Sequence, residues 1–378
     1  MNLKKILSFV LSGILCLFAV ACEKVPQGYK EESAEGMMFD EEGDFVQIYN
    51  YCPCVIVEGE DAYVWYCSNE YSGAHGDHIA YRRGKNVKGK WYWGEKQILF
   101  GPTEGTYYSG NICDPDVIQG EFQYKGETYT WLMTVLGCTT VDNSSNMFGF
   151  KVAKSPDGPW IDVPEISPLY DFYDYYPGYE YDGYSNFIWG WGQSSLISVD
   201  KKGKVLLFYT GRSGTGQKLE YWDFSNLENP TPLYEAEVTN NGVLDLNGNG
   251  DTICNAQFMY DNEKERFYMV CDTHPFSEFE VPTNLPYTSR VYYLDDATGK
   301  EMTHRLGDKK NQWKQLFDID QELTGFIRNH NCCFFRDSYG WKLPGNTLDM
   351  AYTRCLPGVD WKVLYTYRIY RTSYALTV

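Results

Sequence analysis

Five short segments decide the fold of this chain: CPCVI (52–56), DPDVI (114–118), QSSLI (193–197), NAQFM (255–259) and NCCFF (331–335). Each places small or polar residues before an apolar pair, and their first residues lie 62 to 79 residues apart. A turn and a second β-rich run follow each segment, at residues 62–67, 127–136, 204–209, 266–271 and 346–352. Such repetition is typical of propeller blades. We therefore predict an all-β fold, a five-bladed β-propeller with four-stranded antiparallel blades around a central channel.

The first 22 residues predict export and a lipid anchor. Lys4 and Lys5 precede an apolar run over residues 6–20, which is typical of a secretory signal and too short to span a bilayer comfortably. The signal, residues 1–21, ends before Cys22 in a pattern that resembles the lipobox of bacterial lipoproteins. The resemblance implies acylation of Cys22 and attachment to the outer membrane or cell surface. An ordinary signal peptide with a chance cysteine is the alternative.

The chain beyond the signal divides into two parts. Residues 22–44 are acidic and show no apolar period, so they predict a tether between the membrane and the folded domain. Residues 45–378 remain for the propeller, a length that single all-β domains often reach.

Composition narrows the choice of partner. The formal net charge is −18, which repels phosphate backbones, so we expect no nucleic-acid partner. Aromatic residues make up 17% of the chain, with 33 Tyr and 11 Trp. Their flat apolar faces and polar tips suit stacking on sugar rings, and they also suit burial between blades. We expect both uses.

The positions of the cysteines favour buried thiols over a metal site. Twelve are present, of which Cys16 lies in the signal and Cys22 at the anchor. No C-x-x-C pair with a matching histidine spacing appears, so we expect no metal site. Disulfide pairing stays open, because an exported chain can oxidise its thiols.

Three motifs resemble one enzyme family. The segment AKSPDGPW (153–160) resembles the edge strand of glycoside hydrolase family 43 and its five-bladed relatives, the arabinanase, xylosidase, levansucrase and invertase clan. ICDP (112–115) is similar to their second-blade motif, and His330-Asn331 resembles their fifth-blade motif. The resemblance implies inverting hydrolysis of glycosidic bonds by a base in blade one, an acid in blade three and a pKa-tuning aspartate in blade two.

This sequence departs from the family at two of those three positions. Asp114 matches the tuning aspartate, whereas Cys52 stands where the base belongs and Gln193 where the acid belongs. An amide cannot donate a proton as a carboxylic acid does, and a thiol is a poor base. Either other carboxylates have taken over, or catalysis has been lost and sugar binding kept.

The candidate catalytic residues are Asp114 and the replacement carboxylates Asp116, Asp77 and Asp272. The residues that we expect to contact an oligosaccharide or polysaccharide are His78, Glu180, Asp182, Trp191, Gln193, Asn255, His274, His330 and Asn331. No cofactor is required. The resemblance places a water-bound structural calcium near His330, and a buried core histidine is the alternative. A second calcium-like segment, DLNGNGD (245–251), lacks the final glutamate of such loops and favours a tight turn.

The sequence thus predicts a carbohydrate-active surface lipoprotein. Its function is hydrolysis of an oligo- or polysaccharide, with a non-catalytic glycan-binding propeller as the alternative. A structural or adhesive propeller is a third class, since a fold alone does not fix a function.

Overall fold

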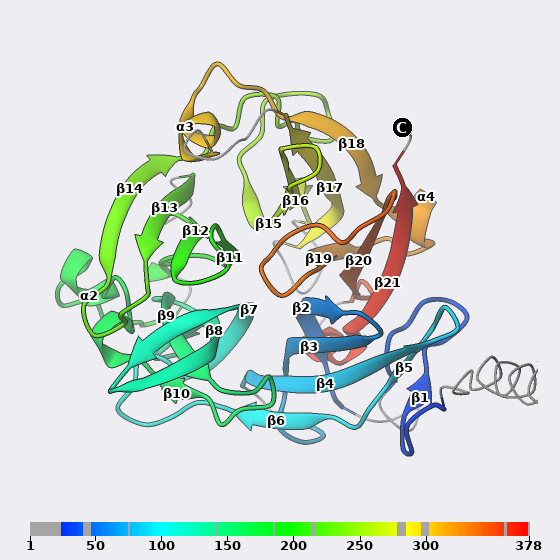
Figure 1. Ribbon diagram of the computed structural model, residues 1–378, viewed down its shortest axis with the longest axis horizontal. Helices are drawn as coiled ribbons and strands as arrows, with labels where there is room; N and C mark the ends of the chain where they lie inside the picture. Colours follow the sequence, from blue (N-terminus) through cyan, green and yellow to red (C-terminus); the bar gives the residue numbers. More distant parts are fainter. Residues whose placement is uncertain are drawn as a thin grey trace, which may run out of the picture.

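The computed structural model describes residues 24–40, 47–74, 76–140, 143–183, 186–212, 216–277, 285–295, 302–358 and 361–376. Its strands form five antiparallel groups around a common centre, the five-bladed β-propeller predicted from the repeats (Figure 1). The predicted signal and Cys22 lie outside the described residues. No helix in the described part of the chain is long and apolar enough to cross a membrane.

The blades follow one another along the chain, each running from an inner to an outer strand. Blade one holds β2 (Asn50–Glu58), β3 (Asp61–Ser68), β4 (His78–Val87), β5 (Lys90–Trp93) and β6 (Gln97–Phe100). Blade two holds β7 (Asn111–Tyr124), β8 (Glu127–Cys138), β9 (Met147–Ala153) and β10 (Ile161–Asp162). Blade three holds β11 (Ser194–Ser198), β12 (Lys204–Thr210), β13 (Gln217–Asp223) and β14 (Thr231–Glu237).

Blade four holds β15 (Cys254–Asp261), β16 (Arg266–Phe276), β17 (Pro286–Leu294) and β18 (Lys314–Ile319). Blade five holds β19 (Asn329–Arg336), β20 (Thr347–Arg354) and β21 (Arg368–Ala375). The described helices are short: α2 (Phe172–Tyr175), α3 (Met302–Gly307), α4 (Gln321–Thr324) and the 3₁₀ turns η1 (Pro164–Ile166) and η5 (Trp361–Thr366). The prediction of four strands per blade therefore holds for blades two to four. In blade one β5 and β6 both pair with β4, and the described part of blade five holds three strands, with residues 36–38 hydrogen-bonded to its outer strand β21.

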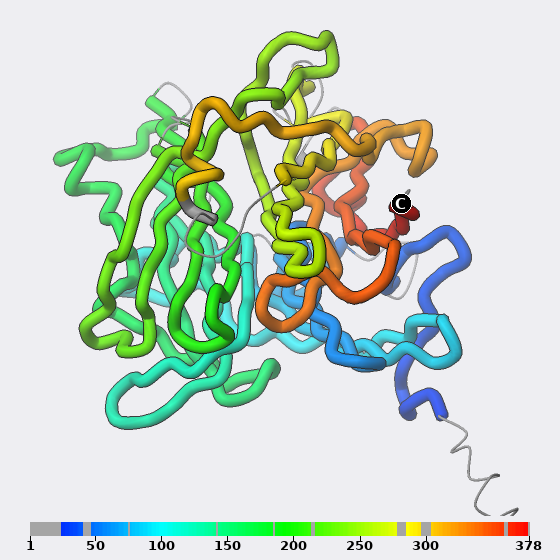
Figure 2. The backbone as a smooth tube through the Cα atoms, turned by 45° about the horizontal axis from the view of Figure 1, so that its top comes forward, coloured from blue at the N-terminus to red at the C-terminus, as the bar shows by residue number. Residues whose placement is uncertain are grey.

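The predicted tether is partly folded onto the blades. Strand β1 (Lys30–Glu31) pairs with β5, and the backbone of residues 36–38 hydrogen-bonds to β21. Met38 and Phe39 are buried against blades one and five. Figures 1 and 2 show this blue segment beside the last blade, and parallel pairing of β19 with β2 also joins blades five and one. The tether prediction was wrong for these residues because three apolar side chains, Met37 to Phe39, are too few to form a visible period.

Aromatic side chains fill the spaces between neighbouring blades. Trp65 meets Trp131 between blades one and two, with ring centroids 5.7 Å apart. Phe208 stacks on Phe258 at 4.0 Å between blades three and four. Burial of such rings contributes strongly to stability, because each removes a large apolar area from water. Much of the aromatic excess of the sequence therefore belongs to the core.

Candidate functional site

Equivalent positions of the five blades form a ring that we call the axial ring: Cys52, Asp114, Gln193, Asn255 and Asn331. Four of them, all except Gln193, have left-handed backbone with φ between 44° and 50°, and each of these four lies where the pairing register of its strand shifts. Such a bulge redirects a side chain out of the regular alternation of a strand. The ring members also make contacts across blades, since Asn331 Nδ2 donates to Gln193 Oε1 at 3.4 Å.

Asp114 lies among sulfur atoms. Its Oδ1 is 3.7 Å from Cys67 Sγ, and its backbone N–H donates to the same sulfur at 2.9 Å. Burial raises the pKa of Asp114, while hydrogen bonds from the thiols of Cys52, Cys67 and Cys113 lower it. A buried carboxylate with a raised pKa is a frequent feature of functional sites.

Asp77 comes from a loop and reaches the same region. The hydroxyls of Tyr49 and Tyr51 donate to its two oxygens at 2.7 and 2.8 Å. Burial raises the pKa of Asp77 to about 6, against these two hydrogen bonds, and the charge of Asp114 adds to the increase. The two carboxyl groups, Asp77 and Asp114, are thus close enough for the charge of one to act on the other. Neighbouring His78 points elsewhere, with Nε2 at 3.9 Å from Glu70 Oε2.

Asp272 forms a separate buried group in blade four. It accepts hydrogen bonds from Asn255 Nδ2 at 2.9 Å and from Ser289 Oγ at 2.7 Å. Burial raises the pKa of Asp272 to about 7, although both hydrogen bonds oppose the shift. Asp272 therefore holds Asn255 of the axial ring in place.

His330 is a buried core histidine. Its Nδ1 lies 2.5 Å from Asn331 Oδ1, and burial lowers the pKa of His330 to about 4, which keeps the ring neutral. Its Nε2 has no hydrogen-bond partner among the described residues and can accept from a water. Calcium requires several oxygen ligands. Asp272, which accepts a hydrogen bond from the backbone of Asn331, is already engaged by Asn255 and Ser289. These residues do not fit a calcium site.

Asp116, one of the candidate catalytic residues, is a partner in a buried ion pair. Its Oδ1 pairs with Arg336 Nη2 at 2.7 Å, and both side chains are almost completely buried. It also accepts from Gln257 Nε2 and from the backbone N–H of Leu196. The buried ion pair with Arg336 distinguishes Asp116 from the other candidate carboxylates and gives it a structural role at the axis.

Three other predicted contacts are one histidine, paired with an aspartate, and two exposed carboxylates. His274 pairs with Asp251 at 2.8 Å and stacks on Phe276, and its hydrogen bond with Asp251 raises the pKa of His274. Glu180 and Asp182 are exposed on the tyrosine-rich loop.

The segment 245–251 forms the expected turn, in which Asp245 Oδ1 accepts from two backbone N–H groups, each at 2.8 Å.

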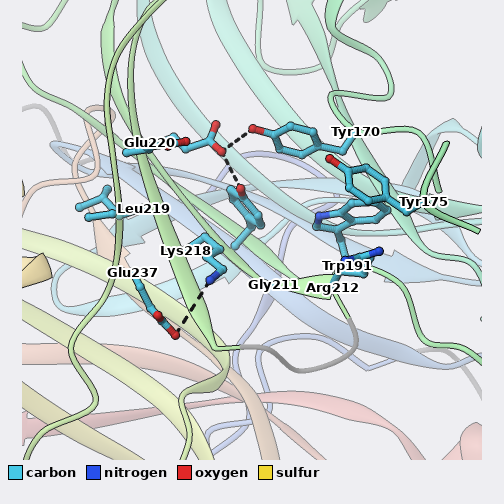
Figure 3. A pocket seen from close by; sticks show the side chains of 12 residues that line it. Tyr170, Tyr175, Trp191, Gly211, Arg212, Lys218, Leu219, Glu220 and Glu237 are labelled. Carbon is cyan, nitrogen blue, oxygen red and sulfur yellow. Dashed lines mark hydrogen bonds and ion pairs between the residues drawn. The ribbon is translucent and has the colours of Figure 1, made fainter.

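A cavity of about 600 Å³ opens beside blade three (Figure 3). Tyr170, Tyr175 and Trp191 form an aromatic wall, where Tyr170 stacks on Trp191 with centroids 6.0 Å apart. The Arg212 guanidinium lies 4.5 Å from the centroid of Tyr175. The remaining lining residues are Tyr209, Gly211, Lys218, Leu219, Glu220, Glu235, Ala236 and Glu237.

The cavity lies at the same end of blade three as the axial ring. Antiparallel pairing sets Ser194, the neighbour of Gln193, opposite Tyr209, then Tyr209 opposite Lys218, and Lys218 opposite Glu237. A ligand in the cavity would therefore lie radially outward from Gln193. Trp191 lines the cavity and precedes Gln193 of the axial ring by two residues, so it connects the cavity to the axial ring.

Glu220 fixes the wall of this cavity, and sequence reasoning missed it. The hydroxyls of Tyr170 and Tyr209 both donate to Glu220 Oε1 at 2.5 Å, and Trp222 Nε1 donates to Oε2 at 2.7 Å. In the sequence Glu220 stands between Leu219 and Tyr221 in a β-rich run, and nothing in this pattern indicates that a charged side chain is buried there or which partners it has.

Backbone pairing to blade two positions Trp191. Its N–H donates to Asn146 O at 3.0 Å. Gly190, with φ of 86°, allows this approach, because a Cβ at that position would lie 2.3 Å from Asn146 O. The predicted contact Trp191 is thus held rigidly in the wall, a favourable property for stacking on a ligand.

Comparison with known proteins identifies the fold. The sequence matches no protein-family model and no curated protein. Among solved structures, an α-L-arabinofuranosidase from Podospora anserina in complex with cellotriose matches with a TM-score of 0.51 at 10% identity, over 92% of this chain and 97% of that one. A family 117 glycoside hydrolase produced by Zobellia galactanivorans matches with a TM-score of 0.50 at 12% identity, over 91% and 88%.

An exo-β-1,3-galactanase from Phanerochaete chrysosporium, with β-1,3-galactotriose, has a TM-score of 0.51 at 14% identity, over 92% of this chain and 64% of the other. At such identities the likeness establishes the propeller fold, in agreement with the resemblance found in the sequence. It leaves the activity to be argued from the site.

Proposed function

We propose that this protein binds an oligosaccharide or polysaccharide in the blade-three cavity and the adjoining axial ring. The observation that carries the proposal is the aromatic wall of Tyr170, Tyr175 and Trp191, bordered by Arg212 and by carboxylates. Aromatic faces next to polar hydrogen-bonding groups are the combination that sugar rings require. The saccharide complexes of similar propellers, with cellotriose and galactotriose, support this ligand class.

Binding is favoured over hydrolysis because the axial ring lacks a suitable acid and base. Inverting hydrolysis needs two carboxyl groups about 6.5–9.5 Å apart with a water between them. Cys52 and Gln193 occupy the two positions that the family resemblance assigns to these groups. Both are buried, and neither performs general acid or base chemistry in the way a carboxyl group does.

Glycan binding can be tested with a panel of arabinan-, galactan- and glucan-derived oligosaccharides in isothermal titration calorimetry. Tyr175→Ala removes an exposed part of the wall and should weaken binding about tenfold, which corresponds to about 1.4 kcal/mol. Tyr71→Ala is the matched control, since Tyr71 is an exposed tyrosine on another loop and does not line the cavity. Unchanged affinity in Tyr175→Ala, or no saccharide bound by the wild type, would exclude this site.

Hydrolysis is the second candidate function, and the proximity of Asp77 to Asp114 favours it. With its pKa raised to about 6, Asp77 is suited to act as a general base near neutral pH. The same saccharide panel can be assayed for released reducing ends. If the wild type cleaves a substrate and Asp77→Asn does not, Asp77 is the relocated base and the binding-only function is rejected.

We also propose that the propeller is carried to the cell surface on a lipid attached to Cys22. The support is the signal-like segment before this residue and the lipobox pattern. Stable anchoring needs more than one acyl chain, which lipoprotein modification supplies. A Cys22→Ser variant should move from the detergent phase to the aqueous phase. Equal partitioning of variant and wild type would argue against the anchor.

A further inference from the structure

Two thiols and a carboxylate from blades one and two converge on one point. Cys52 Sγ, Cys67 Sγ and a carboxylate oxygen of Asp114 all lie within 4.8 Å of one another. Each side chain is at least nine-tenths buried. In a tetrahedral zinc site with Zn–S bonds of about 2.3 Å, ligand atoms lie about 3.8 Å apart, so small side-chain movements suffice to close a site here.

The backbone directs these groups toward each other. Cys52 and Asp114 both occupy strand bulges with positive φ, 46° and 50°, a conformation that L-residues adopt at an energetic cost. Cys67 reaches the point from the end of β3, where its neighbour in the pairing is Tyr51.

One backbone hydrogen bond to the cluster is of the kind found around metal-bound thiolates, although burial raises the pKa of Cys52 and Cys67 while no ion is bound. The backbone N–H of Asp114 donates to Cys67 Sγ at 2.9 Å, and such outer hydrogen bonds orient and stabilise metal-bound ligands. The thiol of Cys113 also hydrogen-bonds to Cys67, which supplies a candidate for a fourth ligand. The cluster therefore offers up to three sulfur ligands and one oxygen ligand.

We propose that Cys52, Cys67 and Asp114 bind a zinc ion, with Cys113 completing a tetrahedral site. Zinc accepts thiolate and carboxylate ligands together, whereas calcium and magnesium take oxygen ligands alone. Binding displaces the thiol protons to solvent. The ion would tie blade one to blade two at the position where the resembled family has its catalytic base. Cys52 and Asp114 also belong to the axial ring, but the test for zinc does not depend on glycan binding.

The site can be tested on the full-length protein purified with a phosphine reductant. After dialysis against Zn²⁺ and then metal-free buffer, elemental analysis should give one zinc per chain. Substitution with Co²⁺ should produce the near-ultraviolet charge-transfer absorption of cobalt–thiolate bonds. Cys52→Ser and Cys67→Ser should each lower the Zn²⁺ affinity at least tenfold. Cys271→Ser is the control, because it removes a buried thiol of blade four that is outside the cluster.

Thermal unfolding distinguishes a variant that has lost zinc binding from one that has lost its fold. The midpoint of thermal unfolding should rise with added Zn²⁺ in the wild type and in Cys271→Ser, and should stay constant in Cys67→Ser and Asp114→Asn. The proposal is overturned if the wild type retains no zinc or if Cys67→Ser retains as much as the wild type. It is also overturned if peptide mapping of protein isolated without reductant finds a Cys52–Cys67 or Cys67–Cys113 disulfide.

Discussion

At the scale of single residues, the ion pair of Asp116 and Arg336 connects the blades at the axis. Arg336 comes from blade five, and its Nη1 also donates to the carbonyl oxygens of Leu196 and Phe258 in blades three and four. Asp116 belongs to blade two, so the ion pair joins blades two and five. A buried ion pair stabilises the fold little more than apolar side chains of similar size would. Removal of one partner, however, leaves a buried charge without compensation.

Arg336→Met should therefore destabilise the fold by about 3–5 kcal/mol, as loss of one partner of a buried pair does. Guanidinium denaturation measures this free energy of unfolding. The double variant with Asp116→Leu should recover part of the loss. Glu127→Gln is a suitable comparison, because it breaks an exposed ion pair with Lys154 and should cause no measurable change. A mild effect of Arg336→Met would show that water reaches the pair.

The raised pKa of Asp272 predicts a pH-dependent stability. Its pKa is about 7 in the folded state against an ordinary value of 3.8, so between these values the folded chain holds a proton that the unfolded chain has lost. The free energy of unfolding should consequently fall as pH rises from about 4 to about 7, by up to about 1.4 kcal/mol per pH unit from this one group. The stabilisation is complete below the unfolded pKa and is lost above the folded one.

Asp272→Asn should flatten this dependence, as measured by denaturation at several pH values in that window. Of the remaining groups, Asp77, with its pKa raised to about 6, makes the free energy of unfolding fall with pH. His330, with its pKa lowered to about 4, makes it rise over nearly the same window, so these two contributions oppose each other. Glu104→Gln, on an exposed residue, should keep the wild-type slope. An unchanged slope in Asp272→Asn would mean that Asp272 is ionised throughout this range.

At the scale of elements, the innermost strands could be predicted because their pattern repeats. The five predicted innermost segments lie in β2, β7, β11, β15 and β19, except for Gln193, which precedes β11. The five β-rich runs that follow them lie in the strands paired with these, except for residue 346, which precedes β20. Small or polar residues before an apolar pair mark the bulge and the buried strand, and both are local properties. The left-handed backbone at four of these bulges was not predicted. Asparagine and aspartate, at three of the four positions, adopt it more often than most residues, but even they do so in a minority of cases, and Cys52 gives no such signal.

Contacts between distant segments could not be predicted. The cysteine cluster joins Cys52, Cys67 and Asp114, whose spacing fits no known metal motif. The cavity similarly depends on the register between β11, β12, β13 and β14. Asp114, Gln193 and Trp191 were chosen as functional candidates from their positions, and their roles remain predictions. Asp116 was chosen in the same way, although its partner Arg336, 220 residues away, gives it a structural role.

The segment before blade one acts as an outer element of the propeller. Met38 is fully buried, and its N–H donates to Ile369 O at 3.0 Å. Met38→Ala should therefore cost about 2–5 kcal/mol, the usual loss for a buried methionine, and should lower the thermal midpoint. Glu35→Ala, three residues earlier and exposed, should leave the midpoint unchanged. If both variants melt like the wild type, the segment contributes nothing to stability.

At the scale of the whole molecule, the buried clusters of blades one to five are shared between neighbours. One cluster spans blades one to three, another blades three and four, another blades four and five, and another blades five and one. Each blade therefore completes its core only against the next one. Because β19 also pairs with β2, the first and last blades are linked as well. An isolated blade would expose the faces that these clusters bury.

This arrangement predicts that the propeller unfolds as one cooperative unit. Phe258→Ala removes a ring stacked on Phe208 between blades three and four and should cost about 3–5 kcal/mol. Denaturation should be followed by tryptophan fluorescence and by far-ultraviolet circular dichroism. Both transitions should shift to lower denaturant together, because loss of one interface weakens every blade through its neighbours. Leu233→Ala, on an exposed position of β14, should shift neither. Separate transitions for the two probes in Phe258→Ala would show instead that blades three and four can open while the other blades stay folded.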